Sequence, residues 1–376
     1  MAVVTVEPDQ LEAISASVAD AASPISVVEP ERRVFALEHP WPGGTSPAEE
    51  VPALSADYLR GFRDATQCLT SSVGGVQAAA VPEVAPAAVD ESQVTWGLLA
   101  TNAASSCHSG QGIRVAVLDT GLDLRHPDFT GRTVVHRSFI PGQEVQDGNG
   151  HGTHCVGTAC GPRAPGSLPR YGIAFGAEIY AGKVLSNEGS GSDRGILAGM
   201  NWAVTSDCAV ISMSLGASLP CPGTGQGYSR VFERAAQRAR RAGTAIIAAA
   251  GNDSSRPVQV CPVSHPANCP SIMAVGALDS RMRVAPFSNR GFNPEGGQVD
   301  IAGPGVDVRS SWPGPTRYRS ISGTSMATPH VAGIAALLAE ANPDASAAEL
   351  VALLTSTARR LQLPASDVGA GMVQAP

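Results

Sequence analysis

The stretch "IRVAVLDTG", residues 113–121, holds a short and continuous apolar run that ends in Asp-Thr-Gly. Four similar runs follow along the chain: "EIYAGKVL" (178–185), "CAVISMSLG" (208–216), "TAIIAAAGN" (244–252) and "IMAVGAL" (272–278). Such runs are typical of parallel strands that are buried on both faces. Helical patterns accompany them over residues 193–206, 229–242, 325–341 and 346–359. This alternation predicts an α/β domain with a mostly parallel sheet and helices on both faces.

The composition is that of a large globular protein, with 376 residues of which 43% are hydrophobic and 16% are charged. No apolar run reaches the roughly 20 residues of a membrane span, so we expect no membrane partner. The net charge of −7 and the lack of a basic block indicate no nucleic-acid partner. The charge is uneven, because residues 1–92 carry −10 and residues 93–376 carry +3. This asymmetry fits an acidic N-terminal unit docked on a mildly basic main domain.

The N-terminal part has its own strand and helix pattern. A strand is expected over residues 2–6, a helix over 8–20, one or two strands over 25–37 and a helix over 55–70. Residues 72–92, "SVGGVQAAAVPEVAPAAVDES", lack an amphipathic period and are typical of a linker. We therefore expect a small α+β domain over residues 1–71, a linker over 72–93 and the main domain over 94–376.

The compartment stays open. The first residues lack the positive segment and the long apolar segment of a signal peptide, which favours a cytoplasmic protein. The eight cysteines favour secretion into an oxidising environment.

Three segments carry candidate catalytic side chains. Asp119 ends a predicted strand, and on its own it could equally cap the following turn. His151 in "GNGHGTHCVGTAC" is flanked by glycines that keep it accessible, as a general base requires. His151, His154 and Cys155 could instead bind zinc, or His154 could be a buried core histidine. Ser325 in "SGTSMATPHVAG" (322–333) is either a nucleophile or a helix cap.

Taken together, these segments resemble one protease family. "VAVLDTG", "GHGTHCVGT" and "GTSMATPHVAG" look like the three signature blocks of subtilisin-like serine proteases, in the same order along the chain. The resemblance covers roughly residues 94–360, and Cys155 favours the proteinase K-like branch. It implies a serine endopeptidase with Asp119, His151 and Ser325 as its triad, acting on peptides or proteins through an acyl-enzyme without a cofactor.

The resemblance also assigns an oxyanion hole and a substrate cleft. It implies that the amide of Asn252 donates to the oxyanion. One cleft edge would contain Gly189, Ser190 and Gly191, a second would contain Ser214, Leu215 and Gly216, and the facing wall of the P1 pocket would contain Ala249, Ala250 and Gly251. Asp193 falls where many relatives carry an aromatic residue at the rim of the P4 pocket. We therefore expect little preference for an aromatic P4 residue and tolerance of a polar or basic one.

A structural calcium ion is also implied by the resemblance. The proteinase K-like site would use the carboxylate of Asp300 and the carbonyl oxygens of Pro270 and Ile272, and oxygen ligands suit calcium. A strand-end aspartate without a metal is the alternative.

The cysteines allow several pairings, because spacing does not determine connectivity. Cys261 and Cys269 are close together in a proline-rich loop and could be bridged, and Cys107 and Cys208 are a second candidate pair. By resemblance, Cys155 is expected to be a free thiol behind His151.

The N-terminal unit resembles a subtilisin propeptide, which assists folding and whose C-terminal tail occupies the cleft before self-cleavage. The resemblance therefore implies a monomeric zymogen inhibited by its own propeptide and cut somewhere in 72–93. A permanent accessory domain is the alternative. Two other functions stay open: an intracellular processing protease dedicated to one partner or leader peptide, and a catalytically silent binding scaffold.

Overall fold

The computed structural model describes residues 10, 14, 17–18, 27–38, 90–221, 227–292 and 296–376. The chain divides into two units, one formed by residues 1–40 and 89–376 and the other by residues 41–88. The second unit, the predicted helix over 55–70 and most of the predicted linker lie outside the described residues. Within the predicted helix over 8–20, the described residues 10, 14, 17 and 18 are helical.

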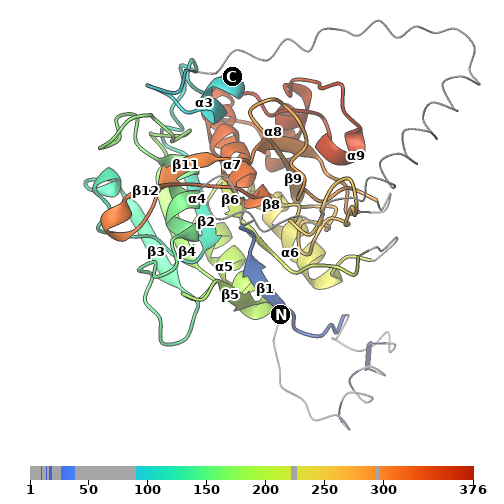
Figure 1. Cartoon of the computed structure of the whole chain (residues 1–376). Helices are drawn as coiled ribbons and strands as arrows, with labels where there is room; N and C mark the ends of the chain where they lie inside the picture. The colour runs from blue at the N-terminus through green and yellow to red at the C-terminus, as the bar shows by residue number, and fades with distance from the viewer. Residues whose placement is uncertain are drawn as a thin grey trace, which may run out of the picture. The chain divides into compact units, whose positions relative to one another are not determined.

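A seven-stranded parallel sheet forms the centre of the main domain (Figure 1). Its strands, in spatial order, are β10 (Ile301–Pro304), β9 (Met273–Leu278), β8 (Ala245–Ala249), β6 (Val210–Met213), β2 (Arg114–Asp119), β4 (Glu178–Lys183) and β3 (Val134–Ser138). The chain order reverses at the neighbouring strands β2 and β6. In open parallel sheets the crevice beyond such a reversal is where ligands bind.

Alternate side chains of each strand belong to two separate apolar cores. In β2, Val115 and Val117 lie in the core that includes residues of α4 (His151–Cys160) and α7 (Thr324–Ala341). Ala116 and Leu118 lie in the core that includes residues of α5 (Asp193–Thr205) and α6 (Arg230–Arg241). Because successive strand residues point to opposite faces, a continuous apolar run supplies both cores at once.

Smaller elements complete the described structure. Two of the helices, α3 (Trp96–Ala100) and α9 (Ala365–Val368), are short, and α8 (Ala347–Ser356) packs on α7. Strands β11 (Val308–Ser311) and β12 (Tyr318–Ile321) form a hairpin, and single 3₁₀ turns lie at Pro127–Phe129 and Gly314–Thr316. A three-stranded antiparallel sheet has the order β5 (Ser190–Ser192), β1 (Arg33–Ala36) and β7 (Leu215–Gly216).

The predicted α/β fold with helices on both faces of a mostly parallel sheet is confirmed. The five apolar runs contain β2, β4, β6 with β7, β8 and β9, and the four helical patterns match α5, α6, α7 and α8. The predicted strand region 25–37 contains β1. No described helix is both long enough and apolar enough to cross a membrane.

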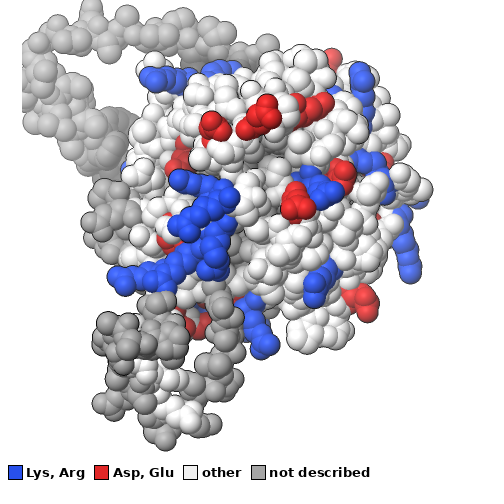
Figure 2. Space-filling model, turned by 180° about the vertical axis from the view of Figure 1, so that it is seen from behind, with Lys and Arg blue, Asp and Glu red and all other residues white. Residues whose placement is uncertain are grey.

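Basic side chains gather in one patch on the face seen from behind (Figure 2). Helix α6 presents five exposed arginines to solvent: Arg230, Arg234, Arg238, Arg240 and Arg241. Three of them lie in the last turn, where positive charge is favourable beside the negative end of the helix dipole.

Candidate active site

Asp119 and His151 form a buried hydrogen-bonded pair. Asp119 is the last residue of β2, and His151 begins α4 directly after Gly150, whose φ of 114° favours glycine. The distance between Nδ1 of His151 and Oδ1 of Asp119 is 2.8 Å, and Oδ1 also accepts a hydrogen bond from the backbone N–H of Thr120. The carboxylate therefore holds the proton on Nδ1, and Nε2 has no hydrogen-bond partner among the residues that the structure describes.

The surroundings of His151 act on its pKa in opposite directions. Burial opposes the charged form of His151, but the negative charge of Asp119, its hydrogen bond and the neighbouring Cys155 together raise the pKa of His151 well above its usual range. A histidine in this setting is stabilised once it has accepted a proton.

Ser325 is the second residue of α7, so its backbone N–H is among those left unpaired at a helix start. Its hydroxyl donates to the carbonyl oxygen of Ser214 at 3.1 Å. The thiol of Cys155 joins the histidine and the serine: its Sγ lies 3.8 Å from Nδ1 of His151 and 3.6 Å from the carbonyl oxygen of Ser325. The structure therefore brings Asp119, His151 and Ser325 together, with the serine hydroxyl turned to Ser214.

The contacts of His154 do not suit a metal ligand, whereas side-chain atoms of Asp119, His151 and Cys155 lie within 4.8 Å of one another. His154 is buried, its Nε2 lies 2.8 Å from the carbonyl oxygen of Val308, and burial lowers its pKa to about 3. His154 is therefore a buried core histidine, one of the two alternatives that the sequence left open. Burial raises the pKa of Cys155 to about 11, so without a metal ion this residue is a thiol.

The side-chain amide of Asn252 has a fixed orientation. Its Oδ1 accepts hydrogen bonds from the backbone N–H of Thr324 at 2.9 Å and from the Thr324 hydroxyl at 2.8 Å. Its Nδ2 is therefore free to donate on the opposite side, and it donates to the carbonyl oxygen of Leu37 at 2.6 Å. The amide is thus held by Thr324, the residue that directly precedes Ser325 in the chain.

Both predicted cleft edges lie beside the same strand of this chain. Strand β1 pairs with β5 through Val34 opposite Gly191 and Phe35 opposite Ser190, and with β7 through Ala36 opposite Leu215 (Figure 1). The carbonyl oxygens of Gly189 and Ser214 accept hydrogen bonds from the backbone of Ala36 and Leu37. Residues 249–251, the predicted facing wall, end β8 and continue to Asn252.

Asp193 is buried at the start of α5. Its Oδ1 lies 3.1 Å from Nε2 of His265, and its Oδ2 accepts from the backbone N–H of Arg32 at 3.1 Å and from the Arg32 guanidinium at 3.3 Å. This carboxylate is thus satisfied by one partner of the main domain and one of the N-terminal segment.

Lys183, the single lysine of the sequence, is fully buried behind Asp119 at the end of β4. Its ammonium donates to the carbonyl oxygen of Thr120 and, at 2.9 Å, to Oδ1 of Asn187. Burial lowers its pKa. The sequence analysis gave this residue no role, and the structure shows it holding the turn that follows the catalytic strand.

Asp300 carries a buried carboxyl group before β10. Burial raises its pKa to about 6, and Oδ2 accepts one hydrogen bond, from the backbone N–H of Ala274 at 2.7 Å. A buried carboxylate whose pKa no neighbouring basic side chain lowers is a suitable ligand for a cation. Asp300, with the carbonyl oxygens of Pro270 and Ile272, remains the predicted calcium ligand set.

The structure corrects the cysteine pairing. Cys261 is bonded to Cys221, 40 residues away, and not to Cys269, because residues adjacent in the folded loops need not be adjacent in sequence. Cys269, Cys107 and Cys208 are free, so the second candidate pair is also wrong. Cys155 is a buried free thiol, as expected.

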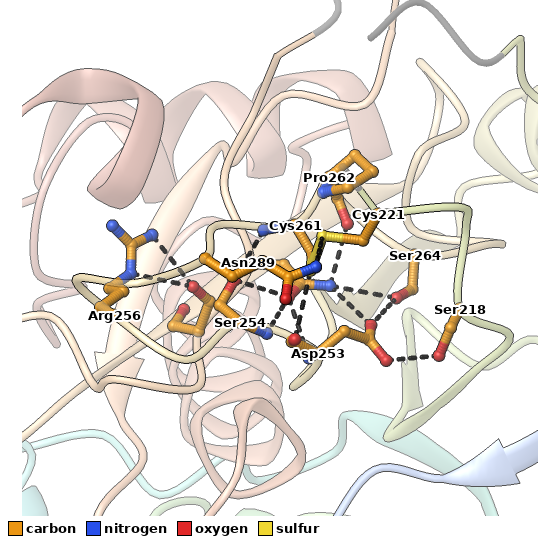
Figure 3. The surroundings of a disulfide bond; sticks show 11 residues. Ser218, Cys221, Asp253, Ser254, Arg256, Cys261, Pro262, Ser264 and Asn289 are labelled. Carbon is orange, nitrogen blue, oxygen red and sulfur yellow. Dashed lines mark hydrogen bonds between the residues drawn. A yellow bond between two sulfur atoms is a disulfide. The ribbon is translucent and has the colours of Figure 1, made fainter. Parts of the chain in front are cut away.

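The disulfide lies beside the turn that follows Asn252 (Figure 3). Asp253 donates its backbone N–H to Oδ1 of Asn289 at 3.0 Å, and its Oδ2 accepts from Nδ2 of Asn289 at 2.8 Å and from the hydroxyl of Ser264 at 3.1 Å. Residues 217–221 continue from β7, so the disulfide links a cleft edge to the loop of the oxyanion donor. The sequence analysis missed Asn289 and Thr324, whose polar contacts fix this loop and could not be found from local spacing.

Comparison with known proteins identifies the family of this chain. The Subtilase family matches residues 110–372. M-protease of Shouchella clausii (strain KSM-K16) is 37% identical over 331 residues, which cover 87% of this chain and 79% of that protein. Subtilisin Savinase of Lederbergia lenta is 40% identical over 286 residues, covering 75% and 97% of the two chains. The chain belongs to the subtilase family and is a serine endopeptidase.

Proposed function

We propose that this protein hydrolyses peptide bonds through an acyl-enzyme formed on Ser325, with His151 as general base and Asp119 as its partner. The observation that carries this proposal is the buried hydrogen bond between Asp119 and His151, which lies beside Ser325 and leaves Nε2 without a partner. A serine hydroxyl is a weak nucleophile until such a base accepts its proton.

The reaction follows from these groups. The Ser325 hydroxyl turns from Ser214 to His151, gives its proton to Nε2 and attacks the carbonyl carbon of the substrate. The oxyanion is stabilised by Nδ2 of Asn252 and by the backbone N–H of Ser325 at the start of α7. His151 then donates the proton to the leaving nitrogen, and water releases the acyl group by the same steps in reverse.

Binding of the substrate relies on backbone pairing. Residues 189–191 and 214–216 supply the two edges between which an extended peptide adds as a third strand. We also propose that the protein is a zymogen whose own N-terminal part is the first peptide bound there. The relatives named M-protease and Subtilisin Savinase are consistent with a protease that acts on peptide or protein substrates.

Calcium is proposed as a structural ion only. Asp300, Pro270 and Ile272 would hold it, and its charge would stabilise the buried carboxylate. It supplies no step of the reaction.

Labelling with a fluorophosphonate probe tests the catalytic proposal. Wild-type protein should gain the mass of one probe molecule, and Ser325→Ala should gain none. Ser356→Ala is a control that removes an exposed hydroxyl at the end of α8 and should still be labelled. Labelling of Ser325→Ala, or no labelling of wild type after its N-terminal part has been lost, would contradict the assignment of Ser325.

A further inference from the structure

The cleft of this structure is filled by residues of the same chain that lie more than 50 residues before the main domain begins. Strand β1 runs antiparallel between β5 and β7, with Arg33 opposite Ser192 at one end and Ala36 opposite Leu215 at the other. Leu37 extends this pairing, because its backbone N–H donates to the carbonyl oxygen of Ser214 at 3.4 Å. An extended segment held on both sides in this way has the pose of a bound substrate.

One carbonyl group of the segment lies in the oxyanion site. The carbonyl oxygen of Leu37 accepts from Nδ2 of Asn252 at 2.6 Å. It also lies against Gly323, where an added Cβ would come within 2.5 Å of it, so the close approach requires glycine. Leu37 is therefore at P1, and the next bond, Leu37–Glu38, lies at the point of attack.

The side chains alternate as a substrate's would. Leu37 is 7% exposed and packs against Gly216, and Val34 is fully buried, whereas Phe35 between them is 49% exposed. The site thus has an apolar pocket for P1 and another for P4, and none for P3. Val34 occupies the P4 position, and the tolerance of a polar or basic P4 residue stays a prediction.

Three charged residues anchor the segment upstream of these pockets. Arg32, at P6, contacts Asp193. Glu31 accepts the backbone N–H of Arg194 at 3.2 Å at the start of α5, and Glu29 accepts the backbone N–H of Arg230 at 2.7 Å at the start of α6. Carboxylates are favourable at both places because helix N-termini carry partial positive charge.

We propose that Leu37–Glu38 is the first peptide bond that this protease cleaves, and that residues 29–37 are its built-in substrate and inhibitor. This inference rests on the proposed function and names the bond on which it first acts. In the reaction, Ser325 attacks the carbonyl carbon of Leu37. Its proton passes through His151 to the nitrogen of Glu38, and water then releases Leu37 as a carboxylate.

The inference also defines a substrate class. Peptides with an apolar residue such as leucine at P1, a small apolar residue at P4 and a basic residue at P6 reproduce the two buried contacts and the ion pair with Asp193. A cut within 72–93 would then come later, on a chain that already begins at Glu38.

Intact mass spectrometry of the full chain over time tests the bond. Wild type should first yield fragments 1–37 and 38–376, and Ser325→Ala should stay at 376 residues. A first cut at any other bond in a protein that reacts with the fluorophosphonate probe would overturn this inference and leave the proposed function standing. A chain that neither cuts nor reacts, even after removal of its N-terminal part by an added protease, would overturn the proposed function instead.

A matched pair of variants sharpens the test. Leu37→Asp places a charge in the P1 pocket and should slow this cut by about 100-fold or more, whereas Phe35→Asp places the same charge on an exposed side chain and should change it less than about threefold. Leu37→Ala adds no charge and should slow the cut by about tenfold, which keeps the test decisive if Leu37→Asp fails to fold. Equal rates for the Leu37 and Phe35 variants would contradict the proposal.

Discussion

The two sheets of this protein are held together in different ways. The parallel sheet is built from strands such as β8, "AIIAA", whose residues are all buried and pack into two cores. The small sheet contains β5, "SGS", which has no apolar side chain, and β7, which has two residues. Its middle strand is held by backbone hydrogen bonds and a few pockets.

This difference separates a scaffold from a binding site. Side-chain packing is specific for one sequence, so the parallel sheet can form only from its own strands. Backbone pairing accepts many sequences, so the middle strand of the small sheet can be exchanged for another peptide. Residues at the junction of the two sheets should affect turnover, whereas residues of the parallel sheet that lie outside the site should affect stability.

Asn252 lies at this junction, after β8 and against Leu37, and gives the largest expected effect. Asn252→Asp keeps an oxygen for Thr324 but replaces the donor by a negative charge. We expect kcat on a peptide substrate to fall by a factor of about 10²–10³ with little change in KM, because the donor acts mainly on the transition state. The active enzyme concentration is determined with the fluorophosphonate probe.

Thr324→Val is the matched control for Asn252. It removes one of the two hydrogen bonds that orient the amide and keeps the donor, so kcat should fall by only about tenfold. A nearly unchanged kcat for Asn252→Asp would show that the junction does not govern catalysis.

The disulfide links a loop of each sheet and should affect stability more than chemistry. Cys221→Ser with Cys261→Ser opens a loop of 40 residues, which should lower the free energy of unfolding by about 3–4 kcal/mol. Denaturant unfolding is measured in the Ser325→Ala background to prevent self-digestion. Cys107→Ser removes an exposed free thiol and should leave stability unchanged; an equal loss in both variants would contradict the role of the disulfide.

Asp300 precedes β10 of the parallel sheet, and its substitution should have the smallest effect on turnover. Without calcium, its raised pKa of about 6 means that the unfolded chain ionises first, so stability falls as pH rises from about 4 to 6. The loss is roughly 3 kcal/mol at most. Asp300→Asn should abolish this pH dependence, measured by thermal unfolding in EDTA in the Ser325→Ala background.

Added calcium should oppose this loss of stability at higher pH. It should raise the melting temperature of the parent protein above pH 6 and leave that of Asp300→Asn unchanged, because the carboxylate is the charged ligand. Asp344→Asn removes an exposed carboxylate and should behave like the parent in both conditions. A calcium response retained in Asp300→Asn would place the ion elsewhere.

The sequence predicted the scaffold better than the binding site. Buried parallel strands such as β2 and β8 are continuous apolar runs, so they are visible locally. Strand β3 was missed because it is an edge strand with exposed residues, "VVHRS", and no apolar run.

The site was predicted as far as it lies in short motifs. Asp119, His151, Ser325 and Asn252 each stand in such a motif, and the structure brings them together. The place of Leu37 could not be predicted, because its hydrogen bonds to residues 177 and 215 positions away follow from backbone geometry and not from its neighbours in the sequence. The partner of Cys261 was missed for the same reason.

The burial of Lys183 makes this protein simple to follow by amine chemistry. With its one lysine enclosed beside Thr120 and Asn187, the only other amine of the chain is the α-amino group. Each internal cut adds one new α-amino group, at Glu38 if the first cut is the proposed one. An amine-reactive dye applied to the folded protein would therefore count chain ends and turn self-processing into a signal that can be read without a substrate.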